Sequence, residues 1–181
     1  MASIADHRQL NDAAFHAGLN SGSAYEWVDE ANRLHFYVIG IQRDGDGVLS
    51  YTVAVRSLDG SGPQRRGVRL GRPEVSGLQP GQAAKCSFPL TNTGQANASE
   101  ELNNDVYRLS VSSRGRGWTA QLDNALTTAR AGGTVAVPVY VSRAAGSARS
   151  TTVTLTAKSE SDPRVTRSLT CTVDIRDTTR R

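Results

Sequence analysis

Residues 83–94 read AAKCSFPLTNTG, and apolar side chains occupy every second position of most of this stretch. Alternate residues of an extended chain point to the same side, so one face would carry Ala84, Cys86, Phe88 and Leu90. The other face is mainly polar, which is typical of a strand with one side in a core and one side in water. The stretch ends in Asn92-Thr93-Gly94, which is turn chemistry. This pattern predicts a β-domain.

The same alternation recurs on both sides of this stretch, between turns such as Gln79-Pro80-Gly81 and Gly132-Gly133. Seven candidate strands result, at residues 72–76, 83–91, 105–113, 117–122, 134–142, 151–159 and 165–175. Seven strands in roughly 100 residues, with frequent turns, fit an immunoglobulin-like sandwich. We therefore predict an all-β chain whose main domain, residues 73–177, is an immunoglobulin-like β-sandwich of about seven strands.

Residues 1–60 hold a smaller β pattern. Strand-like runs lie at 24–29, 33–41 and 48–56, and Asp44-Gly45-Asp46-Gly47 reads as a hairpin turn between the last two. One face of the middle run carries Leu34, Phe36 and Val38. The other face carries His35, Tyr37, Ile39 and Ile41. Both faces are therefore apolar, yet three strands form a marginal core. We predict that residues 1–60 are a small β-hairpin unit, the remnant of an upstream domain.

Charge divides the chain at a similar place. Residues 1–60 carry four basic and eight acidic side chains, a net −4, whereas the remainder carries 17 and 9, a net +8. A basic cluster of Arg65, Arg66, Arg69 and Arg72 lies in the Gly- and Pro-containing segment 61–72. Surfaces that bind single-stranded nucleic acid interleave aromatic and basic residues, but no aromatic residue lies between Pro63 and Phe88. We therefore predict that 61–72 is a basic linker and that nucleic acid is not a partner.

Two cysteines, Cys86 and Cys171, both fall on the core-facing side of their predicted strands. They could form a disulfide, which is common in extracellular sandwiches, or they could be two buried free thiols. A disulfide would differ from the usual immunoglobulin bridge, because Cys171 lies in the last predicted strand. Two cysteines alone are a poor structural zinc site, which needs four ligands.

Catalytic motifs are missing from the sequence. Asp44-Gly45-Asp46-Gly47 resembles the start of a calcium loop, but valines stand at the later ligand positions, Val48 and Val55, so a tight turn is favoured. No His-Glu-x-x-His or Gly-x-Ser-x-Gly motif occurs. We predict no catalytic residues, no metal and no cofactor.

Aromatic residues are the candidates for ligand contacts. Trp118, Tyr107 and Tyr140 could stack on sugar rings, although Trp118 at a strand start would more often fill the core of a sandwich. The first residues lack the apolar core of a signal peptide, and no run of 18 apolar residues occurs. We expect no membrane span and a secreted location, with the signal peptide upstream of this sequence.

Two stretches resemble known families. The second domain resembles the immunoglobulin-like module associated with NPCBM domains and α-galactosidases. The resemblance rests on Leu78–Gly81, Phe88–Gly94, Tyr107–Ser110, Gly117-Trp118, Ala131-Gly132 and Ser159–Pro163. This family implies a non-catalytic spacer or adhesion module, with no catalytic residues to transfer.

The first unit is similar to the end of the catalytic region of secreted zinc metalloproteases of the immune-inhibitor-A type. The matching stretches are Tyr25–Asp29, Leu34–Ile39 and Gly47–Val55. The family's zinc site lies upstream of the matching part, so the resemblance implies no peptidase activity for these residues.

Together these observations predict a non-catalytic C-terminal accessory module of a secreted bacterial hydrolase, a metalloprotease. Its role would be to position or stabilise the enzyme, or to attach it to a substrate or cell surface. The expected partners are the upstream catalytic domain and a polysaccharide or cell-surface protein. Two alternatives remain at this point: a carbohydrate-binding module, and a protein-interaction or assembly domain that uses the hairpin edge.

Overall fold

The computed structural model describes residues 26–77 and 83–175. The chain divides into two compact units, Met1–Gly60 and Ser61–Arg181. The described residues form strands and one short 3-10 helix, η1 (Glu100–Asn103), which confirms the predicted all-β class. None of the helical segments in these residues is long and apolar enough to cross a membrane.

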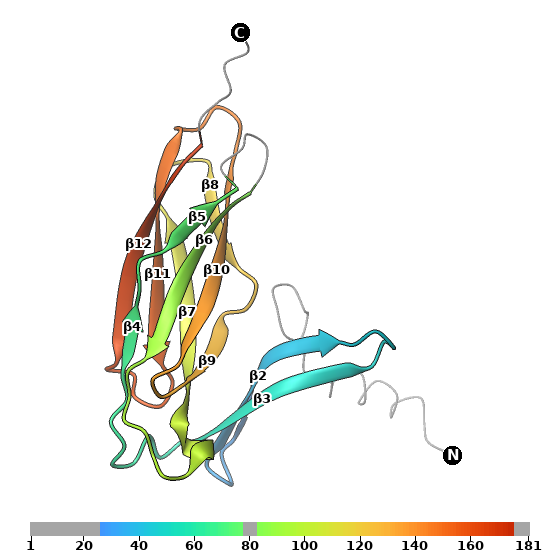
Figure 1. Ribbon diagram of the computed structural model, residues 1–181, viewed down its shortest axis with the longest axis vertical. Coiled ribbons are helices and arrows are strands. Elements are labelled where there is room, and N and C mark those ends of the chain that lie inside the picture. The colour runs from blue at the N-terminus through green and yellow to red at the C-terminus, as the bar shows by residue number, and fades with distance from the viewer. Residues whose placement is uncertain (1–25, 78–82, 176–181) are drawn as a thin grey trace. The chain divides into compact units, whose positions relative to one another are not determined.

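The first unit contains a three-stranded antiparallel sheet in the order β1-β2-β3, here called the hairpin sheet. Its strands are β1 (Glu26–Asp29), β2 (Leu34–Arg43) and β3 (Leu49–Ser57), and Figure 1 shows β2 and β3 as a long ribbon. At the tip, Asp44 Oδ1 accepts hydrogen bonds from the backbone N–H groups of Asp46 (3.0 Å) and Val48 (2.9 Å). This carboxylate therefore closes a tight turn.

A β-bulge alters one predicted face of this sheet. The register shifts between Val38 and Gly40, so that Val38 pairs with Val53 while Ile41 pairs with Tyr51. Tyr51 and Val53 lie two residues apart and share a face, so Ile41 lies on the same face as Val38. The prediction that Ile41 shares the face of His35 is therefore wrong.

The second unit is a sandwich of two antiparallel sheets (Figure 1). One sheet has the order β4-β6-β10-β8, with β5 also paired to β6, and the other has the order β12-β11-β7-β9. The strands are β4 (Val68–Leu70), β5 (Glu74–Ser76), β6 (Ala84–Asn92), β7 (Asn104–Ser113), β8 (Trp118–Leu122), β9 (Leu126–Arg130), β10 (Thr134–Arg143), β11 (Ser150–Ser159) and β12 (Thr166–Asp174).

The seven predicted strands all occur, with ends that differ by at most two residues, but the described residues of this unit contain two more strands. β9 forms the edge of the second sheet beside β7. β4 pairs with the end of β6 and buries Val68. The prediction of a linker at 61–72 is therefore wrong for Val68–Leu70, which belong to the sandwich.

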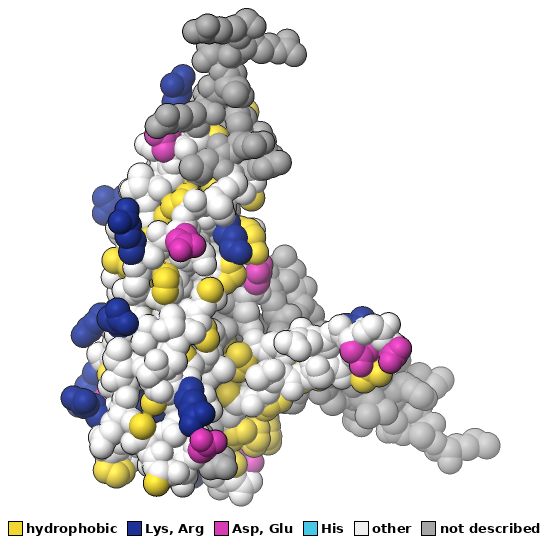
Figure 2. All heavy atoms as spheres, in the orientation of Figure 1, with side chains coloured by type: hydrophobic (Ala, Val, Ile, Leu, Met, Phe, Trp, Pro, Cys, Tyr) yellow, Lys and Arg dark blue, Asp and Glu magenta, His cyan; other side chains and the backbone are white. Residues whose placement is uncertain are grey.

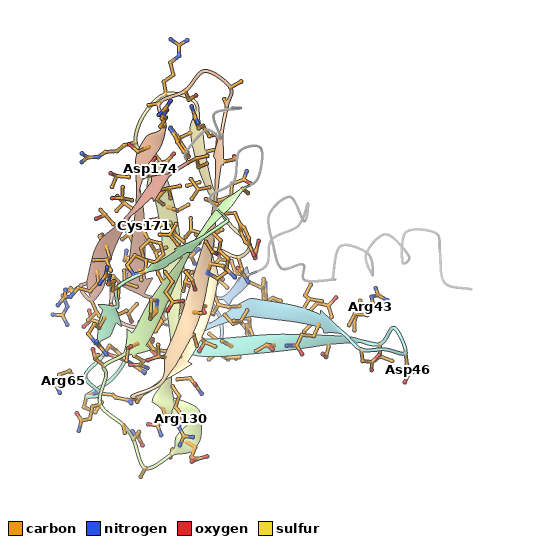
Figure 3. The ribbon with its side chains drawn as sticks, turned by 45° about the horizontal axis from the view of Figure 1, so that its top comes forward. Arg43, Asp46, Arg65, Arg130, Cys171 and Asp174 are labelled. Carbon is orange, nitrogen blue, oxygen red and sulfur yellow. A yellow bond between two sulfur atoms is a disulfide. The ribbon has the colours of Figure 1, made fainter. Side chains whose placement is uncertain are left out.

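The core lies between the two sheets. The inward positions predicted on β6 (Ala84, Cys86, Phe88 and Leu90) are all fully buried, as are Val153 and Leu155 on the facing β11. Cys86 and Cys171 form a disulfide that joins β6 to β12, with their Cα atoms 6.6 Å apart; Figure 3 labels Cys171 on β12. The bridge ties one sheet to the other, and the alternative of two free thiols is wrong.

Candidate docking surface

One side of the hairpin sheet carries a continuous row of apolar side chains. At one end of the row, Phe36 on β2 is paired with Trp27 on β1 and with Val55 on β3. The row continues toward the turn between β2 and β3. It contains first the pair Val38–Val53, then the pair Ile41–Tyr51, and finally Leu49. We call these eight residues the apolar face: Trp27, Phe36, Val38, Ile41, Leu49, Tyr51, Val53 and Val55.

Much of the apolar face is open to solvent. Trp27, Val53 and Val55 are 51%, 54% and 51% exposed, and Leu49 and Tyr51 are 43% and 42% exposed. The Trp27 ring stacks on Phe36 with centroids 5.3 Å apart, so the aromatic end of the row is held in place. Contiguous exposed apolar surface of this kind marks interaction sites in soluble proteins.

The opposite side of the hairpin sheet carries a buried polar network. His35 Nε2 lies 3.0 Å from a carboxylate oxygen of Glu26, and its Nδ1 lies 2.8 Å from the Tyr37 hydroxyl. Arg56 Nε donates a hydrogen bond of 2.6 Å to the same hydroxyl. The Tyr37 hydroxyl therefore links the His35 ring to the Arg56 guanidinium, and the other side of the ring faces Glu26.

This network resembles a carboxylate–histidine–hydroxyl relay, but Tyr37 is completely buried and its hydroxyl is held by Arg56. A nucleophile must reach a substrate, so the arrangement fits a brace between the three strands. Sequence reasoning treated His35 alone and missed the network. The available signal was that Glu26, His35, Tyr37 and Arg56 all fall on one face of the predicted strands.

The sandwich also contains paired polar side chains. The Ser159 hydroxyl donates to buried Asp105 (2.7 Å), and Arg108 forms a two-pronged salt bridge with Glu160 at 2.7 and 3.2 Å. These contacts satisfy groups that would otherwise be costly to bury. Among the described residues there is no group of three or more His, Cys, Asp or Glu side chains with the spacing of a metal site.

The structure separates the three predicted ligand-contact aromatics. Trp118 is 6% exposed and its Nε1 donates to the Ala148 carbonyl (3.1 Å), and Tyr107 is fully buried with its hydroxyl donating to the Gly67 carbonyl (2.9 Å). Neither ring can stack on a sugar, so their prediction as contact residues is wrong: both belong to the core. Tyr140 on β10 is 37% exposed.

Comparison with known proteins identifies the class. Residues 68–176 match the family model described as Peptidase M6-like domain, and residues 1–58 match a model described as a middle domain. The first match covers more than half of the chain, so the chain belongs to the peptidase M6-like family. The sandwich is thus a metallopeptidase-associated module, as predicted, whereas the resemblance to the NPCBM-associated module stays a prediction.

A protein of Arthroderma benhamiae, described as a secreted metallopeptidase, is 46% identical over 178 residues. The match covers 90% of this chain and 26% of that protein, so the chain spans about a quarter of its relative's length. Among solved structures, a member of the MSP family from C. elegans, WR4, covers 59% of this chain with 10% identity and a TM-score of 0.33.

Proposed function

We propose that this chain is a non-catalytic accessory region of a secreted metallopeptidase, and that the apolar face packs against another part of the same protein. The observation that carries the proposal is that five of the eight side chains of the apolar face, Trp27, Leu49, Tyr51, Val53 and Val55, are 42–54% exposed, although Val38 between them is buried. The matched family and the related protein supply the context, since both are described as peptidases.

Energetics favour a covered apolar face. Fully burying one large apolar side chain contributes roughly 1.5–3 kcal/mol, and five such side chains are now about half exposed. Three strands with a buried apolar face are about the minimum for a stable sheet, and apolar side chains that stay in water do not contribute to that stability. A partner that covers this face would therefore stabilise the hairpin sheet as well as bind it.

The proposed occupant is the catalytic part of the parent peptidase. The relative is about four times as long as the matched region, because that region is 26% of it, and residues 1–58 match a domain described as a middle domain. A middle domain has sequence on both sides of it, and the sandwich accounts for one side. The charge of the first 60 residues, −4 against +8 for the remainder, also sets the two units apart.

The disulfide supports an extracellular location for the sandwich. Structural disulfides persist in oxidising compartments and are rare in the cytosol, and the related protein is described as secreted. In this proposal the sandwich is a cross-linked spacer that holds the peptidase in place, and the residues that take part in peptide hydrolysis lie in the catalytic part.

Hydrogen exchange would test the docking proposal. Amide exchange in β3 should be at least tenfold slower in a longer protein that contains the catalytic part than in the 181-residue chain. Val53→Lys and Val55→Lys, placed on the apolar face, should remove this protection. Thr52→Lys is the matched control, because Thr52 is exposed on the opposite face of the same strand.

Two outcomes would count against this function. Equal exchange rates in the short and long proteins would show that nothing covers the apolar face. Sedimentation of the 181-residue chain as a dimer that Val53→Lys dissociates would assign the face to a second copy of this chain.

A further inference from the structure

Four arginines from two distant segments meet in one surface pocket of the sandwich. Arg65 and Arg66 precede β4, whereas Arg164 lies in the turn before β12 and Arg167 lies in β12, about 100 residues later in the sequence. The pocket has a volume of about 300 Å³, and its wall also includes Thr93. Figure 2 shows Lys and Arg side chains along the flank where β4 and β12 lie.

The segment that carries Arg65 and Arg66 is held firmly, unlike a solvated linker. The Arg65 carbonyl accepts a hydrogen bond from Gln95 N (2.8 Å), and the Gly67 carbonyl accepts one from Thr93 N (3.0 Å). A Cβ at Gly67 would lie 2.9 Å from the carbonyl atoms of Thr93, so only glycine permits this approach. In Figure 3 the labelled Arg65 extends from the loop that leads into β4.

The pocket contains more positive charge than its neighbours neutralise. Arg164 is paired with Asp162, with Nε and Nη2 at 3.0 and 3.1 Å from the two carboxylate oxygens. These hydrogen bonds hold the pKa of Asp162 below its usual range, so this pair is neutral overall. Within residues 26–77 and 83–175, no carboxylate forms a salt bridge with Arg65, Arg66 or Arg167.

Of the four arginines, Arg66 is the one whose guanidinium group is fixed in place and still has a hydrogen-bond donor without an acceptor among the described residues. Its Nη1 donates to the Asn104 carbonyl (3.1 Å), which fixes the side chain, while its Nε is buried and makes no hydrogen bond to any residue that the structure describes. A buried unsatisfied donor is costly, roughly 1–3 kcal/mol, and more when charged. An oxyanion in the pocket would compensate the positive charge of this guanidinium group.

We propose that this pocket binds a tetrahedral oxyanion, a phosphate or sulfate group that forms part of a larger ligand. Guanidinium groups match such oxyanions in geometry and charge, and several of them can surround one group. The pocket volume is at the lower end of small-molecule sites, so it has room for the oxyanion and part of the body that carries it. No aromatic side chain lines the pocket, so a stacked nucleobase does not fit.

Titration calorimetry of the 181-residue chain tests the proposal. Sodium sulfate, sodium phosphate and sodium malonate are compared at pH 7.5, with the ionic strength held constant by sodium chloride. Sulfate or phosphate should bind saturably at one site. Repeating the titrations at pH 5.5 distinguishes a site for phosphate from a site for sulfate. Inorganic phosphate loses most of its second charge at this pH, whereas inorganic sulfate keeps both charges.

Charge-removing variants locate the site. Arg66→Gln should weaken binding by about tenfold or more, the value of a charge-assisted hydrogen bond, and Arg167→Gln should weaken it severalfold. Arg116→Gln is the matched control and should leave binding within twofold. Arg116 is exposed in the turn after β7, whereas Asn104, the partner of Arg66, begins that strand.

The thermal midpoint of each variant shows whether it is folded. If Arg66→Gln does not fold, the exposed Arg167→Gln decides the question. The proposal is overturned if neither oxyanion binds more tightly than chloride, if malonate binds as tightly as both, or if Arg116→Gln weakens binding as much as the pocket variants do.

Discussion

At the scale of single residues, the Cys86–Cys171 bridge makes a large expected contribution to stability. It closes a loop of 85 residues between two sheets, and the loop-entropy relation gives about 4.5 kcal/mol for such a loop, from which residual structure in the unfolded chain subtracts. We expect the double variant Cys86→Ala/Cys171→Ala to lose about 3–4 kcal/mol of unfolding free energy in urea titration. Wild type treated with a reductant should show a similar loss. An unchanged urea midpoint in both samples would contradict this assignment.

Tyr107 gives a second prediction at this scale, on pH dependence. Burial, with a smaller contribution from the charge of Asp105, raises the pKa of Tyr107 well above its ordinary value of 10.0. The unfolded chain can release this proton near pH 10 but the folded chain cannot, so the stabilisation is complete below that pH and is lost as the pH rises further.

The Tyr107→Phe variant isolates this effect. Near neutral pH it should lose about 1 kcal/mol, since the hydroxyl no longer donates to the Gly67 carbonyl. Between pH 9 and 11.5 the urea midpoint of the wild type should fall more steeply than that of the variant. Parallel curves over this range would show that Tyr107 titrates normally.

At the scale of elements, the sequence predicted best the strands whose alternation is long. β6, β10 and β11 each have nine or ten residues and were predicted within two residues at both ends. β4 reads VRL, and β9 reads LTTAR and has no aromatic or β-branched residue at its apolar positions. Neither run shows a clear period of two, so its pairing depends on tertiary contacts.

The candidate sites were harder to predict than the strands for the same reason. The apolar face follows from alternation, but its continuation through Ile41 depends on a bulge that leaves little trace in the sequence. The arginine pocket joins residues 65–66 to residues 164–167, which no local pattern connects. Trp118 and Tyr107 could be read as ligand contacts only because alternation does not say which of two faces is the core.

The segment before β4 yields a prediction for a single element. Gly67→Ala would place a Cβ 2.6 Å from Thr93 Oγ1 and 2.9 Å from the Thr93 backbone carbonyl, and the backbone contact cannot be relieved by rotating a side chain. We expect a loss of about 1–3 kcal/mol and a pocket that binds sulfate less well. Gly45→Ala, whose Cβ would have no neighbour within 4 Å, is the control and should change stability little. Equal stability of the two variants would show that the segment is mobile in solution.

At the scale of the whole molecule, the two units differ in what stabilises them. The sandwich has a continuous core between two sheets, closed by a disulfide, whereas the hairpin sheet leaves much of its apolar face exposed. We therefore expect two separate transitions when the 181-residue chain is heated, the first from the hairpin sheet. Amides of β6, β10 and β11 should exchange most slowly, and those of β3 should exchange much faster.

A reductant distinguishes this expectation from a single cooperative unit. Because the only disulfide of the chain lies within the sandwich, reducing it should lower the second transition and leave the first unchanged. If the whole chain melted in one step that shifted on reduction, the hairpin sheet would depend on the sandwich for its stability. Part of the stability of the hairpin sheet would then come from the 181-residue chain itself. A catalytic part that covers the apolar face would no longer be needed to account for all of that stability.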